Sequence, residues 1–254
     1  APSSDKEAQQ AIADLFTDKT SPSLNRAAQG LYPVGSTFKP ITAIAALESG
    51  KTNTSRQIKC NGYLLINNHS HACMGYHSNI SLKTAIAKSC NVYFQQIGVE
   101  TGVDSIDFWA KSFGLGEKTG IEINEYAGYR SNRETMKIKE TDIYHKWTES
   151  DTAQTSIGQL YTLFTPLQLA RYAAALGNGG ILNTPYLIGN IKTASGSVVL
   201  DNSDKNKNAP KVDVSEYVLD AVKEGMIEMV KSSVAAQKAF TAFPQGVIAA
   251  KTGT

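Results

Sequence analysis

The stretch GSTFKP, residues 35–40, opens an alanine-rich apolar run that predicts a helix from Ser36 to the Ser49-Gly50 pair. Pro40 fits only in the first turn of this helix, where its missing N–H costs no hydrogen bond. Ser36 is therefore expected at the positive end of the helix dipole, with Lys39 one turn away on the same face. A serine hydroxyl needs a neighbouring base to act as a nucleophile, and a desolvated lysine beside other cations can supply one. Taken alone, the pattern also fits an N-capping serine and a solvated lysine.

Two further motifs follow in order along the chain. Ser-Cys-Asn at residues 89–91 falls between the short amphipathic runs 82–87 and 92–97, which predicts a tight connection between two helices. Lys-Thr-Gly-Thr at residues 251–254 follows the apolar run 247–250, which predicts a strand. Ser-x-x-Lys, Ser-x-Asn and Lys-Thr-Gly in this order form the signature of penicillin-binding proteins and class A β-lactamases.

From about Pro22 to its last residue, the sequence resembles a class B penicillin-binding protein and is most similar to the elongation-type transpeptidases. The stretches that carry the resemblance, besides the three motifs, are residues 25–27, 32–36, 113–120, 156–159, 165–170 and 177–180. The resemblance implies an α+β fold of the penicillin-binding protein/β-lactamase type, with a helical lobe beside an antiparallel sheet and the active site between them. Two departures from the family pattern are Ala250, where the family usually has glycine, and Val34, where a second proline is commoner.

Four residues are expected to carry the chemistry. Ser36 is the predicted nucleophile and Lys39 the base for acylation. Ser89 would relay protons to the leaving amine, although a serine before a helix can also be a simple cap. Lys251 adds positive charge that would keep Lys39 neutral and attract a carboxylate.

The remaining motif residues are expected to bind substrate. Asn91 offers amide donors and an acceptor that suit a peptide backbone, with a plain turn residue as the alternative. Thr252 and Thr254 offer hydroxyls to a carboxylate, and Gly253 lies between them in the motif. The resemblance implies that the backbone N–H groups of Ser36 and Thr254 form an oxyanion hole.

The predicted function is a D,D-transpeptidase that cross-links peptidoglycan stem peptides through an acyl-enzyme on Ser36, which β-lactams would also acylate. No glutamate in the chain is followed four residues later by asparagine, the pair with which class A β-lactamases activate water, and Cys90 replaces the aspartate of their Ser-Asp-Asn motif. Two alternatives stay open: a D,D-carboxypeptidase or β-lactamase that transfers the acyl group to water, and a β-lactam-sensing domain.

Two cysteines, Cys60 and Cys73, bracket a segment that contains glycine and asparagine. Three histidines lie nearby: His69, His71 and His77. An extracytoplasmic disulfide, a zinc ion held by both cysteines and two histidines (His69 and His71), and two unpaired thiols are all compatible with this spacing. Cys90 is expected to be a small buried hydrophobic residue.

Composition excludes several classes of function. With 254 residues, 41% hydrophobic and 19% charged, the chain is an ordinary globular sequence. A net charge of +2 gives no reason to expect nucleic acid as a partner, and the predicted chemistry needs no cofactor. No apolar run approaches the roughly 20 residues that span a bilayer.

The resemblance sets expectations for the whole protein. Residues 1–254 are expected to be a partial transpeptidase domain, whose sheet lacks flanking strands and a C-terminal helix, and whose membrane anchor lies outside this chain. The expected location is the extracytoplasmic face of the bacterial cell membrane. Stem peptides, β-lactams and, through parts outside this chain, the cell-wall synthesis machinery are the expected partners.

Local patterns predict the remaining elements. Helices are expected at residues 7–16, 103–113, 166–176 (with Thr165 as N-cap, Pro166 at the first position and Gly177 past the end) and 214–230. A hairpin is expected from residues 186–192 and 197–200. Residues 51–79 are expected to be a long connection, residues 122–150 a polar, irregular segment, and residues 201–211 a charged loop rich in asparagine.

Overall fold

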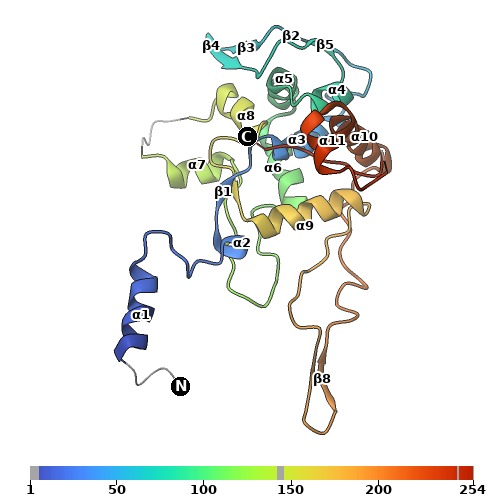
Figure 1. Ribbon diagram of the computed structural model, residues 1–254. Helices are drawn as coiled ribbons and strands as arrows, with labels where there is room; N and C mark the ends of the chain where they lie inside the picture. Colours follow the sequence, from blue (N-terminus) through green and yellow to red (C-terminus); the bar gives the residue numbers. More distant parts are fainter. Residues whose placement is uncertain (1–5, 142–145, 245, 254) are drawn as a thin grey trace.

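The structure is a computed structural model that describes residues 6–141, 146–244 and 246–253 (Figure 1). Its helices are α1 (Lys6–Thr17), α2 (Arg26–Gln29), α3 (Lys39–Glu48), α4 (Leu82–Ala87), α5 (Asn91–Thr101), α6 (Val103–Ser112), α7 (Arg133–Lys139), α8 (Glu149–Thr155), α9 (Pro166–Gly177), α10 (Glu216–Ser232) and α11 (Val234–Ala239). A single 3₁₀ turn, η2 (Gly35–Phe38), leads directly into α3. Its strands are β1 (Tyr32–Pro33), β2 (Ile58–Cys60), β3 (Tyr63–Ile66), β4 (His69–Ala72), β5 (Ser78–Ile80), β6 (Leu163–Phe164), β7 (Asn190–Lys192) and β8 (Val198–Asp201).

Helix α3 forms the centre of the molecule. Every residue from Lys39 to Ala46 is buried, as expected for a helix that is apolar on all sides. Helices α5, α6 and α10 pack around it, while α1 and the β7–β8 hairpin extend away from this helical body (Figure 1). Gly225 lets α10 approach α4 closely, since a Cβ at that position would lie 2.7 Å from the side chain of Ile86. The core therefore holds the N-terminal end of α3 in a fixed place.

The strands form four separate antiparallel pairs: β1 with β6, β2 with β5, β3 with β4, and β7 with β8. The long connection expected at residues 51–79 contains most of two of these pairs, β2 with β5 and β3 with β4. Asn67 and Asn68 both have positive φ, 49° and 65°, which closes the two-residue turn between β3 and β4. Asparagine tolerates this conformation, so the dipeptide was the signal in the sequence.

The predicted helices are confirmed within a few residues of their ends. Thr165 caps α9 through Gln168 in a reciprocal capping box, with Pro166 in its first turn. The hairpin at β7–β8 is also confirmed. In contrast, the predicted irregular segment 122–150 contains α7 and the start of α8, and α7 begins where the Asn132 side chain accepts a hydrogen bond from the N–H of Thr135.

The strand predicted at residues 247–250 is not formed. Within the part of the chain that the structure describes, this segment has no paired strand beside it, and the Ala250 N–H instead donates to the carbonyl of Met226 at 3.2 Å. A strand is stabilised by its ladder partners, so an apolar run without them stays irregular. The expected combination of helices with antiparallel strands is confirmed, and among the described residues these strands form the four short pairs. No described helix combines the length and apolar character needed to cross a membrane.

Candidate active site

Ser36 lies in the 3₁₀ turn that precedes α3, rather than in the first turn of the α-helix itself. Gly35 has a φ of 49°, and its N–H donates to the carbonyl of Gly158 at 3.0 Å. Gly158 also has a positive φ, and a Cβ there would lie 2.1 Å from the carbonyl oxygen of Gly35. The two glycines thus allow a backbone contact that fixes the turn carrying Ser36. Thr37 adds a hydrogen bond from its hydroxyl to the Val34 carbonyl at 2.7 Å.

Lys39 is completely buried beneath this turn. Its Nζ donates to the carbonyl of Ser89 at 2.7 Å, to Ser89 Oγ at 3.0 Å and to Asn91 Oδ1 at 2.7 Å. Burial, followed by the nearby charge of Lys251, lowers the pKa of Lys39 to about 7. A buried ammonium is costly unless hydrogen bonds compensate for the lost water. The three acceptors around Nζ provide such bonds, and they can also hold the neutral amine in place.

Ser89 and Asn91 are brought to Lys39 by the turn between α4 and α5. Ser89 has a φ of 53°, a conformation uncommon for a residue with a side chain. Cys90 is the N-cap residue of α5 and Asn91 its first residue. The Asn91 amide nitrogen donates to the Ala72 carbonyl at 3.1 Å. The predicted tight connection between two helices is therefore confirmed.

Lys251 reaches the same group from the C-terminal end of the described chain. Its Nζ donates to Ser89 Oγ at 2.9 Å and to the Thr252 carbonyl at 3.1 Å, and burial lowers its pKa to about 8. Gly253 lies against the Ser36 turn, because a Cβ on it would be 3.2 Å from the Val34 carbonyl oxygen. Thr254 lies outside the described residues. One hydroxyl, that of Ser89, thus connects the nitrogens of two lysines that are 212 positions apart in the sequence.

These residues open into a polar cavity of about 400 Å³. Four of the predicted site residues line it: Ser36, Ser89, Asn91 and Thr252. Four further lining residues were not singled out from the sequence: Met74, Lys88, Ile157 and Gln159. Ile157 and Gln159 belong to the stretch 156–159 that carries the family resemblance, so a signal for them was present.

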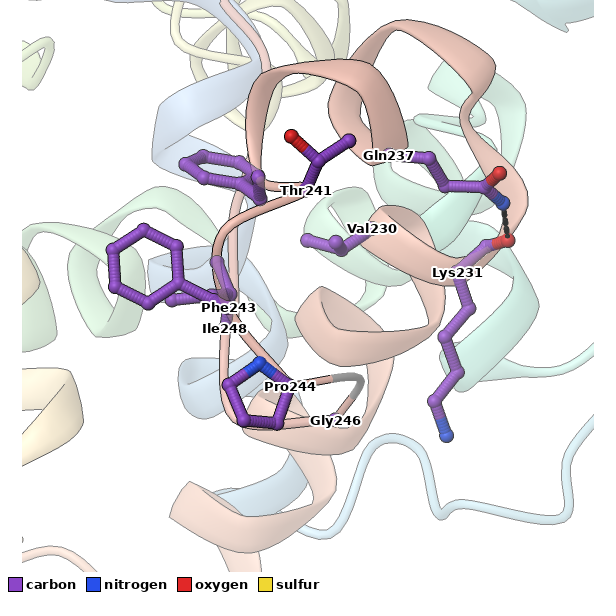
Figure 2. Close-up of a pocket in the computed structure, with 9 residues that line it drawn as sticks. Val230, Lys231, Gln237, Thr241, Phe243, Pro244, Gly246 and Ile248 are labelled. Atoms are coloured by element: carbon purple, nitrogen blue, oxygen red, sulfur yellow. Dashed lines mark hydrogen bonds between the residues drawn. The ribbon is translucent and has the colours of Figure 1, made fainter.

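A second cavity, of about 310 Å³, lies between the end of α10, α11 and the segment that follows (Figure 2). Figure 2 shows that it is lined by Phe243, Pro244, Val230 and Ile248, with Lys231 as its charged side chain. The Gln237 amide is engaged with the backbone carbonyl of Lys231. None of the three motifs contributes to this cavity, and its lining offers no nucleophile paired with a base. The candidate site is therefore the polar cavity beside Ser36.

A cluster of metal-ligating side chains lies directly behind the Ser89–Asn91 turn. Its members are Cys60, Cys73, His77 and Cys90, whose ligand atoms all lie within 4.8 Å of one another. Nδ1 of His77 is 3.5 Å from Cys60 Sγ and 3.6 Å from Cys73 Sγ, and the sulfurs of Cys73 and Cys90 are 3.8 Å apart. The hydrogen bond between Cys73 and Cys90 lowers the pKa of Cys73 and raises that of Cys90.

This cluster corrects the predictions made for the cysteines. All three are free thiols, so the disulfide between Cys60 and Cys73 is not formed. His69 and His71 do not join them, because strand β4 carries both histidines away toward α8, where His71 Nε2 lies 3.2 Å from Ser150 Oγ. Cys90 is buried as predicted, but it belongs to the cluster.

Three thiols and one imidazole are a donor set that suits tetrahedral zinc. The cluster is also joined to the candidate site, since the N–H of Asn91 donates to Cys73 Sγ at 3.2 Å. A metal ion here would bind Cys90, the residue between Ser89 and Asn91. It would therefore hold both side chains that contact Lys39.

Comparison with known proteins places these observations in a family. The chain matches the penicillin binding protein transpeptidase domain over residues 1–254. Peptidoglycan D,D-transpeptidase MrdA of Haemophilus influenzae is 33% identical over 248 residues, which cover 94% of this chain and 37% of that protein. The chain thus spans less than half the length of the curated relatives that it matches.

Solved structures agree with this match. Penicillin-binding protein A from Mycobacterium tuberculosis, in a ceftriaxone acyl-enzyme complex, superposes with a TM-score of 0.79 at 31% identity, covering 98% of this chain and 54% of that one. Helicobacter pylori PBP2, in complex with MreC, gives a TM-score of 0.76 at 27% identity and covers 96% of this chain and 44% of that one.

Proposed function

The chain belongs to the penicillin-binding protein transpeptidase family, and on that basis we propose that it is the acyl-transferring part of a peptidoglycan D,D-transpeptidase. The observation that carries the proposal is the hydrogen-bonded group in which Ser89 Oγ joins Lys39 to Lys251 beside Ser36. A nucleophile, a buried amine with a pKa near neutrality and a proton relay are what an acyl transfer needs.

Acylation begins at Ser36. Lys39, as the neutral amine, takes the Ser36 proton while Oγ attacks the carbonyl carbon of the penultimate D-alanine in the donor peptide. The tetrahedral intermediate then collapses, its C–N bond breaks, and D-alanine leaves. The proton passes from Lys39 through the Ser89 hydroxyl to the departing amine, and the peptide stays attached to Ser36 as an ester. A pKa of about 7 for Lys39 leaves a large neutral fraction at physiological pH.

The other motif residues hold the substrate. Lys251 carries a positive charge for the terminal carboxylate, and Thr252 lines the cavity next to it. Asn91 presents its amide to the peptide backbone of the donor. The backbone N–H groups of Ser36 and Thr254 would form the oxyanion hole, as the family resemblance implies. A missing donor in such a hole costs about 3–4 kcal/mol in transition-state stabilisation.

Transfer to an amine, rather than to water, is supported by the lining of the cavity. Among the described residues, that lining contains no carboxylate that could activate a water molecule. The acyl-enzyme would then persist until the amine of a neighbouring stem peptide attacks the ester, forms the cross-link and restores Ser36. Penicillins, which mimic the donor, would stay bound for the same reason.

We also propose that Cys60, Cys73, Cys90 and His77 hold a structural zinc ion. The donor set and the close spacing of its ligand atoms support this site. The ion would stabilise the turn that presents Ser89 and Asn91, and it would take no part in the proton transfers.

For the whole protein we propose a place at the extracytoplasmic face of the bacterial cell membrane, within the cell-wall synthesis machinery. The support is the family and the solved complex of a related PBP2 with MreC. Peptidoglycan stem peptides and β-lactams would be its small partners.

The proposal is tested by intact-mass measurement of the full-length protein after incubation with a penicillin. We expect one penicilloyl group per chain, retained for hours, and none in Ser36→Ala. Rapid loss of the adduct would instead indicate a β-lactamase. Stable labelling without cross-linking of stem peptides would indicate a sensor, and full labelling of Ser36→Ala would exclude Ser36 as the nucleophile.

A further inference from the structure

A second polar hollow, of about 510 Å³, lies between the β3–β4 hairpin and the beginning of α8. Figure 1 shows this hairpin at the edge of the molecule, beside α5. His69 and His71 line the hollow from β4, and Ser150 and Gln154 line it from α8. The turn residue Asn67 completes one end.

The hairpin borders this hollow through His69, Ser70 and His71 of β4. In the β3–β4 register, His71 is opposite Leu64 and His69 is opposite Ile66, so all four side chains lie on the same face. Ile66 is buried, which identifies this face as the inner one. The two histidines are therefore held over the hollow by the packing of the hairpin.

The hollow lies next to the catalytic cavity on both of its walls, where Asn91 contacts Ala72 and where the Gln154 carbonyl accepts hydrogen bonds from the N–H groups of Ile157 and Gln159. On one wall, Asn91 donates to the carbonyl of Ala72, and the next residue toward the turn is His71. On the other wall, the chain that leaves α8 supplies Ile157 and Gln159 to the catalytic cavity. The contact between His71 and Ser150, at 3.2 Å, joins the two walls.

The chemistry of the hollow suits a polar chain. Its described lining contains imidazole, amide and hydroxyl groups and the carboxylate of Asp151, but no lysine or arginine. The Asp151 carboxylate accepts hydrogen bonds from the N–H and the hydroxyl of Thr148. Such a surface recognises ligands by donating and accepting hydrogen bonds, as peptide amides require.

We propose that this hollow is a subsite for the donor peptide, holding the two or three residues that precede the one attached to Ser36. This proposal rests on the proposed function. A linear peptide with its terminal carboxylate at Thr252 and its scissile carbonyl at Ser36 must extend away from Thr252, past Asn91. The four residues of β4 span about 10 Å from the first Cα to the last, at roughly 3.3 Å per interval. This distance matches the length of three extended peptide residues. A volume of about 510 Å³ is also in the usual range for a small-ligand site.

The test compares three acylating agents on the full-length protein: a penicillin, a short acyl-D-alanyl thioester, and the same thioester extended by three stem-peptide residues. Two variants alter the hollow from opposite walls, His71→Ala and Gln154→Ala. Leu65→Ala is the matched control, because Leu65 is exposed on the same hairpin and does not line the hollow. The second-order rate constant of acyl-enzyme formation is measured for each combination.

We expect each hollow variant to lower the rate with the extended thioester about tenfold, while the rates with penicillin and the short thioester change less than twofold. Leu65→Ala should leave all three rates unchanged. The proposal is overturned if the extended thioester shows no selective loss, or if all three agents lose rate equally, since equal loss indicates a structural role for these positions. A wild-type protein that no penicillin acylates would overturn the proposed function itself.

Discussion

Removing Lys251 should raise the pKa of Lys39 and move the pH dependence of acylation with it. The Nζ atoms of Lys39 and Lys251 lie 3.0 and 2.9 Å from the same atom, Ser89 Oγ, so they are at most about 6 Å apart. Two unit charges at about 6 Å with an effective dielectric constant of about 20 repel each other by about 3 kcal/mol, which corresponds to about 2 in pKa. Lys251→Met should therefore shift the pKa of Lys39 from about 7 to about 9. The pKa stays below the ordinary lysine value because burial, the larger cause of the lowered pKa, remains in the variant.

The sign follows from the role of Lys39 as a base. Acylation needs the neutral amine, so its rate should rise with pH and reach half its maximum near the pKa of Lys39. The wild type should therefore show a midpoint near pH 7, and Lys251→Met a midpoint near pH 9. Near pH 6 the variant should be slower by about 100-fold for this reason alone.

The assay is the second-order rate constant of penicillin acylation between pH 5.5 and 10, measured on the full-length protein. The midpoint of the rising limb is the informative quantity, because the loss of carboxylate binding lowers the rate by a similar factor at each pH below about 8, where Lys251 is charged in the wild type. Lys83→Met is the matched control, since Lys83 is exposed on α4 and its charge is screened by water. An unchanged midpoint in Lys251→Met would refute the reasoning and leave Lys251 with a role in substrate binding only.

Three further predictions follow from the same geometry. Gly158→Ala should lower penicillin labelling at least tenfold, because its Cβ would meet the carbonyl oxygen of Gly35 at 2.1 Å. Gly179→Ala, with a similar positive φ but open space around it, should cost about 1–2 kcal/mol in thermal unfolding and keep labelling. Metal analysis should find one zinc per chain, and Cys73→Ser should bind less zinc and unfold at a lower temperature; three freely alkylated thiols and no metal would contradict this site. Finally, the free energy of unfolding, from denaturant titrations, should rise between about pH 7 and pH 9.5 by up to about 1.4 kcal/mol per pH unit for Lys39. Folded Lys39 has the lower pKa and so binds fewer protons than the unfolded chain over this range, and Lys39→Met should flatten the slope; an identical slope in that variant would show that Lys39 is not the group responsible.

Local chemistry in the sequence was enough to predict most helices and the three motifs. Pro40 and Pro166 mark helix starts because proline lacks the N–H that only a first turn can spare, and Thr165 marks one because its hydroxyl caps the helix. The Asn67-Asn68 turn was equally local, although it was not used. Such features depend on the conformation of a few neighbouring residues, so they can be read without knowledge of the fold.

Tertiary structure alone decided which distant residues meet. The sequence by itself established the types of residue expected at the site, but the strand predicted at residues 247–250 depended on ladder partners that the described chain does not place there. The choice of His77, rather than His69 or His71, for the cysteine cluster depended on the path of the chain: His69 and His71 lie on β4, which carries His71 to Ser150, whereas His77 lies between β4 and β5, beside Cys60 and Cys73. The low pKa of Lys39 needed burial and a second lysine 212 residues away. Burial and charge proximity are properties of the packed chain, and no local pattern of side chains contains them.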